Sequence, residues 1–196
     1  MTLTIEPQRF QHSRILVLGD LMLDRYLWGA VQRISPEAPV PVFQVKRESE
    51  ARGGAGNVVS NLIGLGAAVS VIGLRGEDEA GRKLGALLHH EKIRDLSIEC
   101  PDRPTTTKTR LVSNGQQLIR LDEEEIRLAG SAVAEEVIRR VEENISDADA
   151  IVLSDYGKGL LHSAGLAQAV IAIGRRRGLP VFVDPKGRDW ERYRSA

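Results

Sequence analysis

The residues most able to do chemistry include a run of small residues that leads into an expected helix. Segment 53–57 reads Gly-Gly-Ala-Gly-Asn, and a helical pattern follows from Asn57. Small residues let a ligand approach the backbone, and the free N–H groups at a helix N-terminus can bind an anion or a hydroxyl group. The side-chain amide of Asn57 can also hold a polyol. A flexible turn capped by Asn57 is the alternative interpretation.

Carboxylates follow the first expected strand. The apolar run 14–19 is followed by Asp20 and Asp24. In an open α/β sheet, ligands bind beyond the carboxyl ends of the strands, where carboxylates can accept hydrogen bonds from sugar hydroxyls. A helix N-cap or a loop salt bridge is the alternative for either residue.

Two later strand ends each bring an acid and a lysine close together. Asp155 and Lys158 follow the apolar run 150–154, and Asp184 and Lys186 follow the next run. Lysine is a suitable point charge for a phosphate group. A polar loop explains either pair alone, but the recurrence at equivalent positions favours binding.

Cations also recur on an expected hairpin. Lys108 and Arg110 lie two residues apart, so they share one face of a strand. A solvated strand face is the alternative. The four histidines (His12, His89, His90 and His162) fit no metal or catalytic-triad pattern, and we expect them at the surface.

Alternating strand and helix patterns must position these residues. Apolar runs at 14–19, 69–73, 150–154 and 180–183 are typical of buried parallel strands. Helical patterns lie between and after them, at 57–66, 80–90, 131–143 and 163–178, with Ser163 as an expected N-cap. The alternation predicts βαβ units. Strand-like segments 26–45 and 105–121 interrupt it, the second with Asn-Gly at its centre, which predicts a hairpin.

The composition excludes several classes of function. The 196 residues carry 27 basic and 27 acidic side chains, so zero net charge argues against bulk binding to nucleic acid or to an anionic membrane. No apolar stretch is long enough to cross a membrane, and no signal peptide is evident, so we expect a cytoplasmic protein. The sequence ends after a strand and its turn with no closing helix, and we therefore expect a truncated chain.

The motifs as a set resemble a known family. Segments 19–24, 53–58 and 64–73 resemble the N-terminal half of ribokinase-like (PfkB-type) carbohydrate kinases. More narrowly, the chain resembles the D-glycero-β-D-manno-heptose 7-phosphate kinase domain, which in many bacteria is fused to an adenylyltransferase. The segments that carry this narrower resemblance are 33–42, 106–110, 153–159 and 184–187.

The resemblance implies a fold and a reaction. The fold is a three-layer α/β/α arrangement with a mostly parallel central sheet and a small antiparallel β-lid. The lid comprises segments of about 25–46 and 104–122, within a single domain at 1–196 whose C-terminal part is missing. The reaction is ATP-dependent phosphorylation of the anomeric hydroxyl of heptose 7-phosphate, for ADP-heptose and lipopolysaccharide core synthesis. The resemblance also implies a homodimer formed through the lid.

The resemblance carries over roles for individual residues. Asp20, Gly54 and Asn57 would hold sugar hydroxyls, and Lys108 and Arg110 would approach the sugar or its phosphate from the lid. Asp155 and Lys158 would face the substrate from the sheet edge. Lys186 would lie toward the transferring phosphate.

The chain departs from the family in its catalytic motifs. Relatives carry an Asn-x-x-Glu element that supports Mg²⁺ binding and a Gly-Ala-Gly-Asp loop whose Asp is the catalytic base, and neither motif is present. We therefore assign no catalytic or metal-binding residue, and expect this chain to bind neither ATP nor Mg²⁺ and to be inactive alone. A non-catalytic module that binds sugar phosphate or dimerises, and a kinase for another sugar, are the alternatives.

Overall fold

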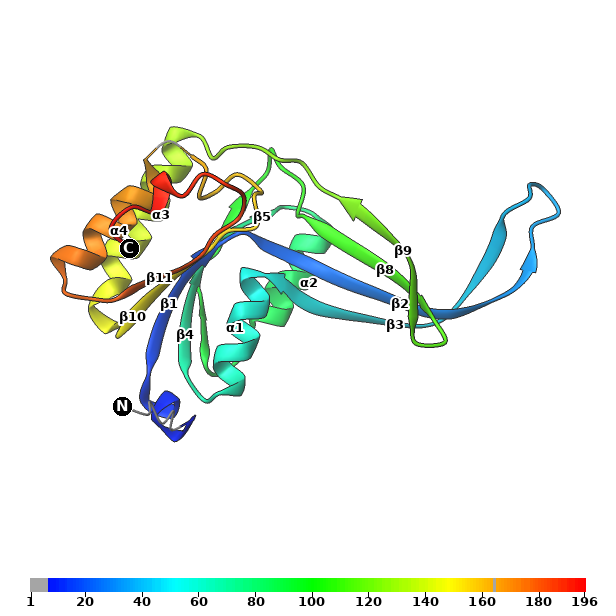
Figure 1. Cartoon of the computed structure of the whole chain (residues 1–196), viewed down its shortest axis with the longest axis horizontal. Coiled ribbons are helices and arrows are strands. Elements are labelled where there is room, and N and C mark those ends of the chain that lie inside the picture. The colour runs from blue at the N-terminus through cyan, green and yellow to red at the C-terminus, as the bar shows by residue number, and fades with distance from the viewer. Residues whose placement is uncertain (1–6, 164) are drawn as a thin grey trace.

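The central element of the fold is a parallel sheet. A computed structural model describes residues 7–163 and 165–196 (Figure 1). The sheet order is β11-β10-β1-β4-β6, and every neighbouring pair is parallel. Its strands are β1 (Arg14–Gly19), β4 (Ala68–Ile72), β6 (Ile93–Asp95), β10 (Ala150–Ser154) and β11 (Val181–Asp184). The four apolar runs thus form strands of one sheet, as predicted.

Two pairs of helices cover the two faces of this sheet. Helices α1 (Ala55–Gly64) and α2 (Glu79–Leu88) lie on one face, and α3 (Ser131–Asn144) and α4 (Leu166–Arg176) lie on the other (Figure 1). The alternation of β1 explains the layers, since Val17 packs with α1 and α2 whereas Leu16 and Leu18 pack with α3 and α4. The predicted three-layer α/β/α fold is confirmed.

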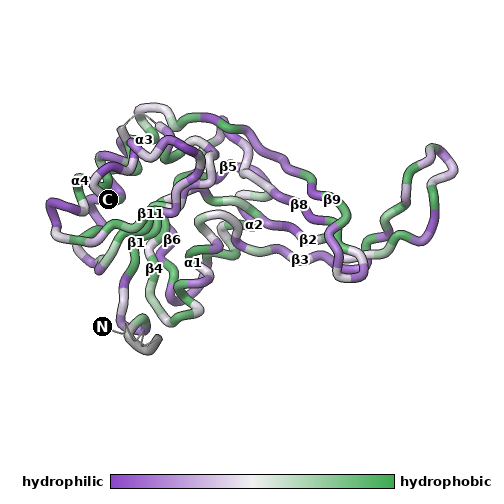
Figure 2. Tube along the Cα trace, viewed as in Figure 1, coloured by the Kyte–Doolittle hydropathy of each residue, from purple (hydrophilic) through white to green (hydrophobic). Residues whose placement is uncertain are grey.

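A second sheet projects from the first. Its order is β3-β2-β8-β9, formed by β2 (Leu21–Ile34), β3 (Pro41–Gly54), β8 (Thr107–Ser113) and β9 (Gln116–Glu123). Strands β2 and β3 form a long hairpin that extends far beyond the core (Figure 1), and this sheet is called the lid below. The lid strands alternate between polar and apolar residues, whereas the central strands are mostly apolar (Figure 2).

The lid hairpin turn follows its predicted chemistry. Asn114 and Gly115 connect β8 and β9 with positive φ values of 50° and 78°, the conformation that an Asn-Gly hairpin turn requires. Strands β2 and β3 run from Leu21 to Gly54, so they exceed the segment 25–46 that the sequence indicated.

Two predicted helix starts were wrong. Helix α1 begins at Ala55 with Gly54 as its N-cap, so Asn57 lies inside the first turn and does not cap the helix. Helix α4 begins at Leu166 with Gly165 as its N-cap. The Ser163 hydroxyl instead donates to the Gly159 carbonyl and accepts from the Ala129 N–H.

Short elements complete the described part of the chain. Strands β5 (Leu74–Gly76) and β7 (Ile98–Cys100) pair in parallel, and 3₁₀ turns lie at η1 (Pro7–His12), η2 (Ile145–Asp147) and η3 (Glu191–Tyr193). Among the described residues, no helix is both long and apolar enough to span a bilayer.

Candidate functional site

Gly54 connects β3 to α1 at the carboxyl edge of the central sheet. Gly54 has φ 58° and ψ −130°, a conformation that L side chains rarely adopt. A Cβ added there would clash with the Asp20 carbonyl oxygen, which accepts a hydrogen bond from the Ala55 N–H at 2.9 Å. The chain therefore leaves β3 and enters α1 directly beside the end of β1.

Asp20 uses its carboxylate to hold the loop that follows β10. It accepts backbone N–H groups from Tyr156 and Lys158 at 3.0 Å each and from Leu160 at 3.3 Å. Its side chain is buried, and this burial raises the pKa of Asp20 although the three hydrogen bonds oppose the shift. In this structure the Asp20 carboxylate therefore binds protein backbone and positions the loop, and its predicted bond to a sugar hydroxyl stays a prediction.

Asp155 is also bound within the protein. Its carboxylate accepts the Gly157 N–H at 2.7 Å, pairs with His162 Nε2 at 2.8 Å and accepts the Tyr193 hydroxyl. Burial would raise the pKa of Asp155, but hydrogen bonds from Tyr193, Gly157 and His162 outweigh it and lower the pKa. The carboxylate thus joins the β10 loop to η3, and the prediction that it faces substrate stays a prediction.

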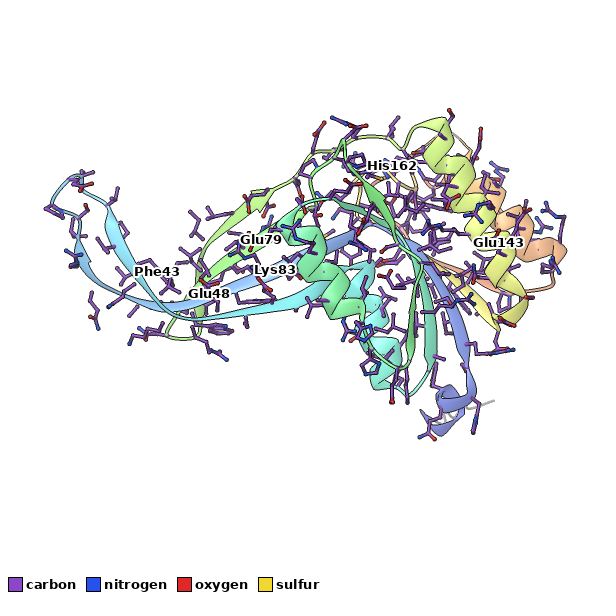
Figure 3. All side chains as sticks on the ribbon, turned by 180° about the vertical axis from the view of Figure 1, so that it is seen from behind. Phe43, Glu48, Glu79, Lys83, Glu143 and His162 are labelled. Atoms are coloured by element: carbon purple, nitrogen blue, oxygen red, sulfur yellow. The ribbon has the colours of Figure 1, made fainter. Side chains whose placement is uncertain are left out.

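The pairing also corrects the expected surface location of His162. Its side chain is half-buried, between the root of the lid and α3 (Figure 3). Tyr193 is buried against the core and was not recognised from the sequence. No local pattern could have found Tyr193, because it lies 38 residues from Asp155 and joins it only through the tertiary fold.

Cations from the lid and from the β10 loop do converge. Lys108 and Arg110 lie on one face of β8, and Lys158 lies on the loop that Asp20 holds. Glu124 bridges the two lysines, with its Oε2 3.1 Å from Lys108 Nζ and 2.7 Å from Lys158 Nζ. The sequence predicted the three cations but not Glu124, whose only signal was its position just after the hairpin.

Asp24 faces this cluster from β2 of the lid. Its Oδ1 lies 2.7 Å from Arg110 Nη1, and a Cβ added to Gly53 would lie 2.8 Å from its Oδ2. Burial first, and then the charges of Asp184 and Asp24, raise the pKa of Tyr156. Asp24 therefore joins the small-residue bend to the lid cations, although the family resemblance had singled out Asp20.

The two remaining predicted residues are accessible beside these groups. Asn57 is exposed in the first turn of α1, and within the described chain its side chain makes no hydrogen bond. Lys186 is exposed after β11, and its Cγ would lie 3.5 Å from a Cβ added to Gly157. Both side chains are thus free to meet a ligand at this edge of the sheet.

Aromatic rings extend the site face along the lid. Tyr26 and Trp28 share the face of Asp24 because they alternate along β2, and their rings stack with centroids 5.9 Å apart. The Arg110 guanidinium lies over Tyr26 at 5.2 Å, and the Arg47 guanidinium lies over Trp28 at 4.8 Å. These contacts hold Arg110 in place from a second side.

The opposite face of the lid is joined to α2. Lys83 Nζ lies 2.9 Å from Glu50 Oε1 of β3 and 3.1 Å from Glu79 Oε1 of its own helix. Figure 3 shows Lys83 and Glu79 on α2 beside the lid strands. The root of the lid is therefore supported on one face by α2 and presents its other face to the β10 loop.

The acids around these cations are the side chains that could ligate Mg²⁺. No group of three or more His, Cys, Asp or Glu side chains in the described part of the chain is arranged to hold a metal ion. The acids nearest the cations are each paired with a cation or a backbone N–H. Residues 7–163 and 165–196 therefore present no cluster of side chains that fits Mg²⁺.

Comparison with known proteins decides the family. The model of the pfkB family of carbohydrate kinases matches residues 12–195. This chain belongs to the pfkB family. Among curated relatives, it is 46% identical to the bifunctional protein HldE of Actinobacillus succinogenes over 96% of this chain and 38% of that protein. It is 47% identical to HldE of Rhodospirillum rubrum over 93% of this chain and 37% of that protein. The chain thus spans less than two fifths of the length of these two relatives.

Solved structures agree with the pfkB fold. A putative phosphofructokinase from Staphylococcus aureus has a TM-score of 0.70 at 16% identity, over 92% of this chain and 55% of that chain. Phosphofructokinase-2 from Escherichia coli, solved with fructose-6-phosphate, has a TM-score of 0.67 at 21% identity, over 92% and 57% respectively. At these identities the likeness shows the fold alone, and it confirms the ribokinase-like architecture.

Proposed function

We propose that this chain provides the sugar-phosphate site of a kinase that transfers phosphate from ATP to the anomeric hydroxyl of D-glycero-β-D-manno-heptose 7-phosphate. The product would be heptose 1,7-bisphosphate, a precursor for ADP-heptose and lipopolysaccharide core synthesis in the cytoplasm. One observation carries the proposal: Lys108, Arg110 and Lys158 converge from the lid and the sheet edge beside a glycine-rich bend. Three cations suit a phosphorylated ligand.

Some residues of the site would contact the sugar phosphate, and others would hold those residues in position. Asp24 and Asn57 would hold sugar hydroxyls, and the backbone of Gly53 and Gly54 would let the sugar approach closely. Lys186 would lie toward the phosphate that is transferred. Asp20 and Asp155 support these contacts from below, because they hold the loop that presents Lys158. ATP, with Mg²⁺, supplies the phosphoryl group and the charge that stabilises its transfer.

We propose no residue of this chain as the base that removes the proton from the anomeric hydroxyl of the sugar. Asp20 and Asp155 are engaged by hydrogen bonds, and Asp24 is paired with Arg110. Asn57 carries an amide, which cannot take up a proton at neutral pH. We therefore propose that residues 1–196 bind the sugar phosphate but do not turn it over alone.

A turnover assay tests this proposal. The 196-residue chain and an HldE relative are each incubated with ATP, Mg²⁺ and heptose 7-phosphate, and ³¹P NMR follows the product. We expect heptose 1,7-bisphosphate from the relative and less than about 1% of that rate from the 196-residue chain, a loss typical when a general base is missing. Comparable rates, or no bisphosphate from the relative, would contradict it. Ribose and a hexose phosphate serve as competing acceptors.

A second proposal concerns assembly. Seven large apolar side chains on the lid strands and the hairpin tip are 39–61% exposed: Val31, Ile34, Val40, Val45, Leu118, Ile119 and Leu121. Exposed apolar groups concentrated on one element indicate an interaction surface. We propose that two copies of the chain pair through their lids. The alternative is that the chain is a module that only binds sugar phosphate or dimerises. In that case no longer relative should convert heptose 7-phosphate to the bisphosphate.

A further inference from the structure

Glu124 lies where two lysines could instead hold a phosphate. A single oxygen of its carboxylate contacts both ammonium groups, at 3.1 Å from Lys108 Nζ and 2.7 Å from Lys158 Nζ. The side chains of Lys108 and Lys158 are only 14% and 12% exposed, so both charges depend on a nearby anion. Two ammonium groups that share one oxygen are also close enough to share one phosphate group.

The two cations are held more firmly than the anion between them. Lys108 belongs to β8, which pairs on both sides, and the backbone of Lys158 is bound to Asp20. Glu124 follows the last residue of β9 and begins the segment 124–130, which has neither helix nor strand. The backbones of both lysines are therefore fixed, whereas Glu124 lies just beyond the last paired residue of β9.

Charge favours replacement of the carboxylate. Partial burial would raise the pKa of Glu124, but hydrogen bonds from Lys158 and Lys108 outweigh it and lower the pKa. Glu124 is therefore ionised at neutral pH and supplies one negative charge. A phosphate monoester supplies about 1.5 to 2 negative charges and three acceptor oxygens. Between two fixed ammonium groups, the phosphate is the stronger partner.

We propose that Glu124 occupies the position of the substrate's phosphate and that a phosphate monoester displaces it from Lys108 and Lys158. Glu124 is then an internal competitor: it neutralises the two lysines and excludes weaker anions. Its displacement frees segment 124–126 as substrate binds, while Lys108 keeps its second carboxylate, Asp122, at 2.8 Å. The inference rests on the proposed function for the identity of the phosphate carrier, but not for the subsite itself.

Binding of inorganic phosphate to the 196-residue chain tests the subsite without turnover. Isothermal titration compares the unaltered chain, Glu124→Gln and Lys158→Met. Glu123→Gln is the matched control, because Glu123 is the neighbouring acid but lines a cavity on the α2 side of the lid. We expect Glu124→Gln to bind phosphate at least about fivefold more tightly, roughly 1 kcal/mol. Glu123→Gln should change binding less than about twofold, and Lys158→Met should abolish it.

Each outcome has a defined meaning. If Glu124 only ties the lid to the core, its replacement loosens the lysines and phosphate binds equally or more weakly, which overturns the inference. Circular dichroism confirms that each variant is folded. Heptose 7-phosphate and heptose are then titrated into the same proteins. Tighter inorganic phosphate binding by Glu124→Gln, without any binding of heptose 7-phosphate, supports the subsite and contradicts the proposed substrate.

Discussion

Asp155 and Asp20 show how much a carboxylate's role depends on where its oxygens point. Both lie just beyond strand ends, as the sequence predicted, and β1 and β10 are neighbours in register from Ile15 to Gly19. Their position followed from the apolar runs, but the direction of each side chain did not. Asp20 turns toward the backbone at Tyr156–Leu160, and Asp155 turns toward Tyr193, because these partners come from parts of the chain that local patterns do not relate.

The ionisation of Asp155 predicts a pH dependence of stability. Its folded-state pKa lies below the ordinary value, so its stabilisation is present above about pH 4 and is lost as the pH falls through the lowered pKa. We expect Asp155→Asn to lower the free energy of unfolding by roughly 2 kcal/mol at pH 7.

Urea denaturation between pH 7 and pH 3 measures this difference. The gap between the unaltered chain and Asp155→Asn should narrow below about pH 4. Asp147→Asn, at an exposed position in η2, is the control and should follow the unaltered chain. A gap that stays constant down to pH 3 would show that the charge of Asp155 is not what stabilises the fold.

At the scale of elements, long patterns were predictable and short ones were not. Four strands of the central sheet, all but the three-residue strand β6, and the Asn114-Gly115 turn follow directly from hydrophobic runs and turn chemistry. Strands β5 and β7 have three residues each, too few for any periodicity to be recognised. The start of α1 at Ala55 depends on the conformation of Gly54, which is set by contact with Asp20 rather than by a capping side chain.

The bend at Gly54 gives the clearest prediction for an element. Gly54→Ala places a Cβ against the Asp20 carbonyl at a positive φ, and we expect a loss of about 3 kcal/mol in unfolding free energy. Gly64→Ala is the control in the same helix, where a Cβ meets nothing within 4 Å, and it should be neutral or stabilise by up to about 1 kcal/mol. Thermal and urea unfolding measure both, and equal stability of the two variants would contradict the role assigned to Gly54.

At the scale of the molecule, the lid completes the candidate site, whose other parts are the β10 loop and the start of α1. The hairpin signals predicted an antiparallel element beside the core, but not that β2 and β8 would pair in parallel and bring Asp24 beside Lys108. That pairing joins segments 84 residues apart, so no local spacing could reveal it. The cations of the cluster were therefore predictable as a list of residues, and of its acids Asp24 was predicted but Glu124 was not.

The proposed pairing of lids predicts a change in oligomeric state. We expect the unaltered chain to be dimeric in size-exclusion chromatography with light scattering. Ile119→Lys should shift it to a monomer, because a charge on a half-exposed apolar residue of β9 opposes burial between copies. Leu65→Lys is the control, since Leu65 is 44% exposed at the end of α1, outside the lid. A monomeric unaltered chain would rule out the lid dimer.

Lid and core together form the proposed site for a phosphorylated sugar. The most direct measurement is isothermal titration of heptose 7-phosphate and heptose into the 196-residue chain, Lys158→Met and Lys92→Met, the last at the opposite edge of the sheet. We expect the phosphorylated sugar to bind the unaltered chain at least about tenfold more tightly than heptose. Lys158→Met should remove this preference and Lys92→Met should keep it. Equal affinity of the unaltered chain for the two sugars, or a preference that survives in Lys158→Met, would contradict a phosphate site between lid and core.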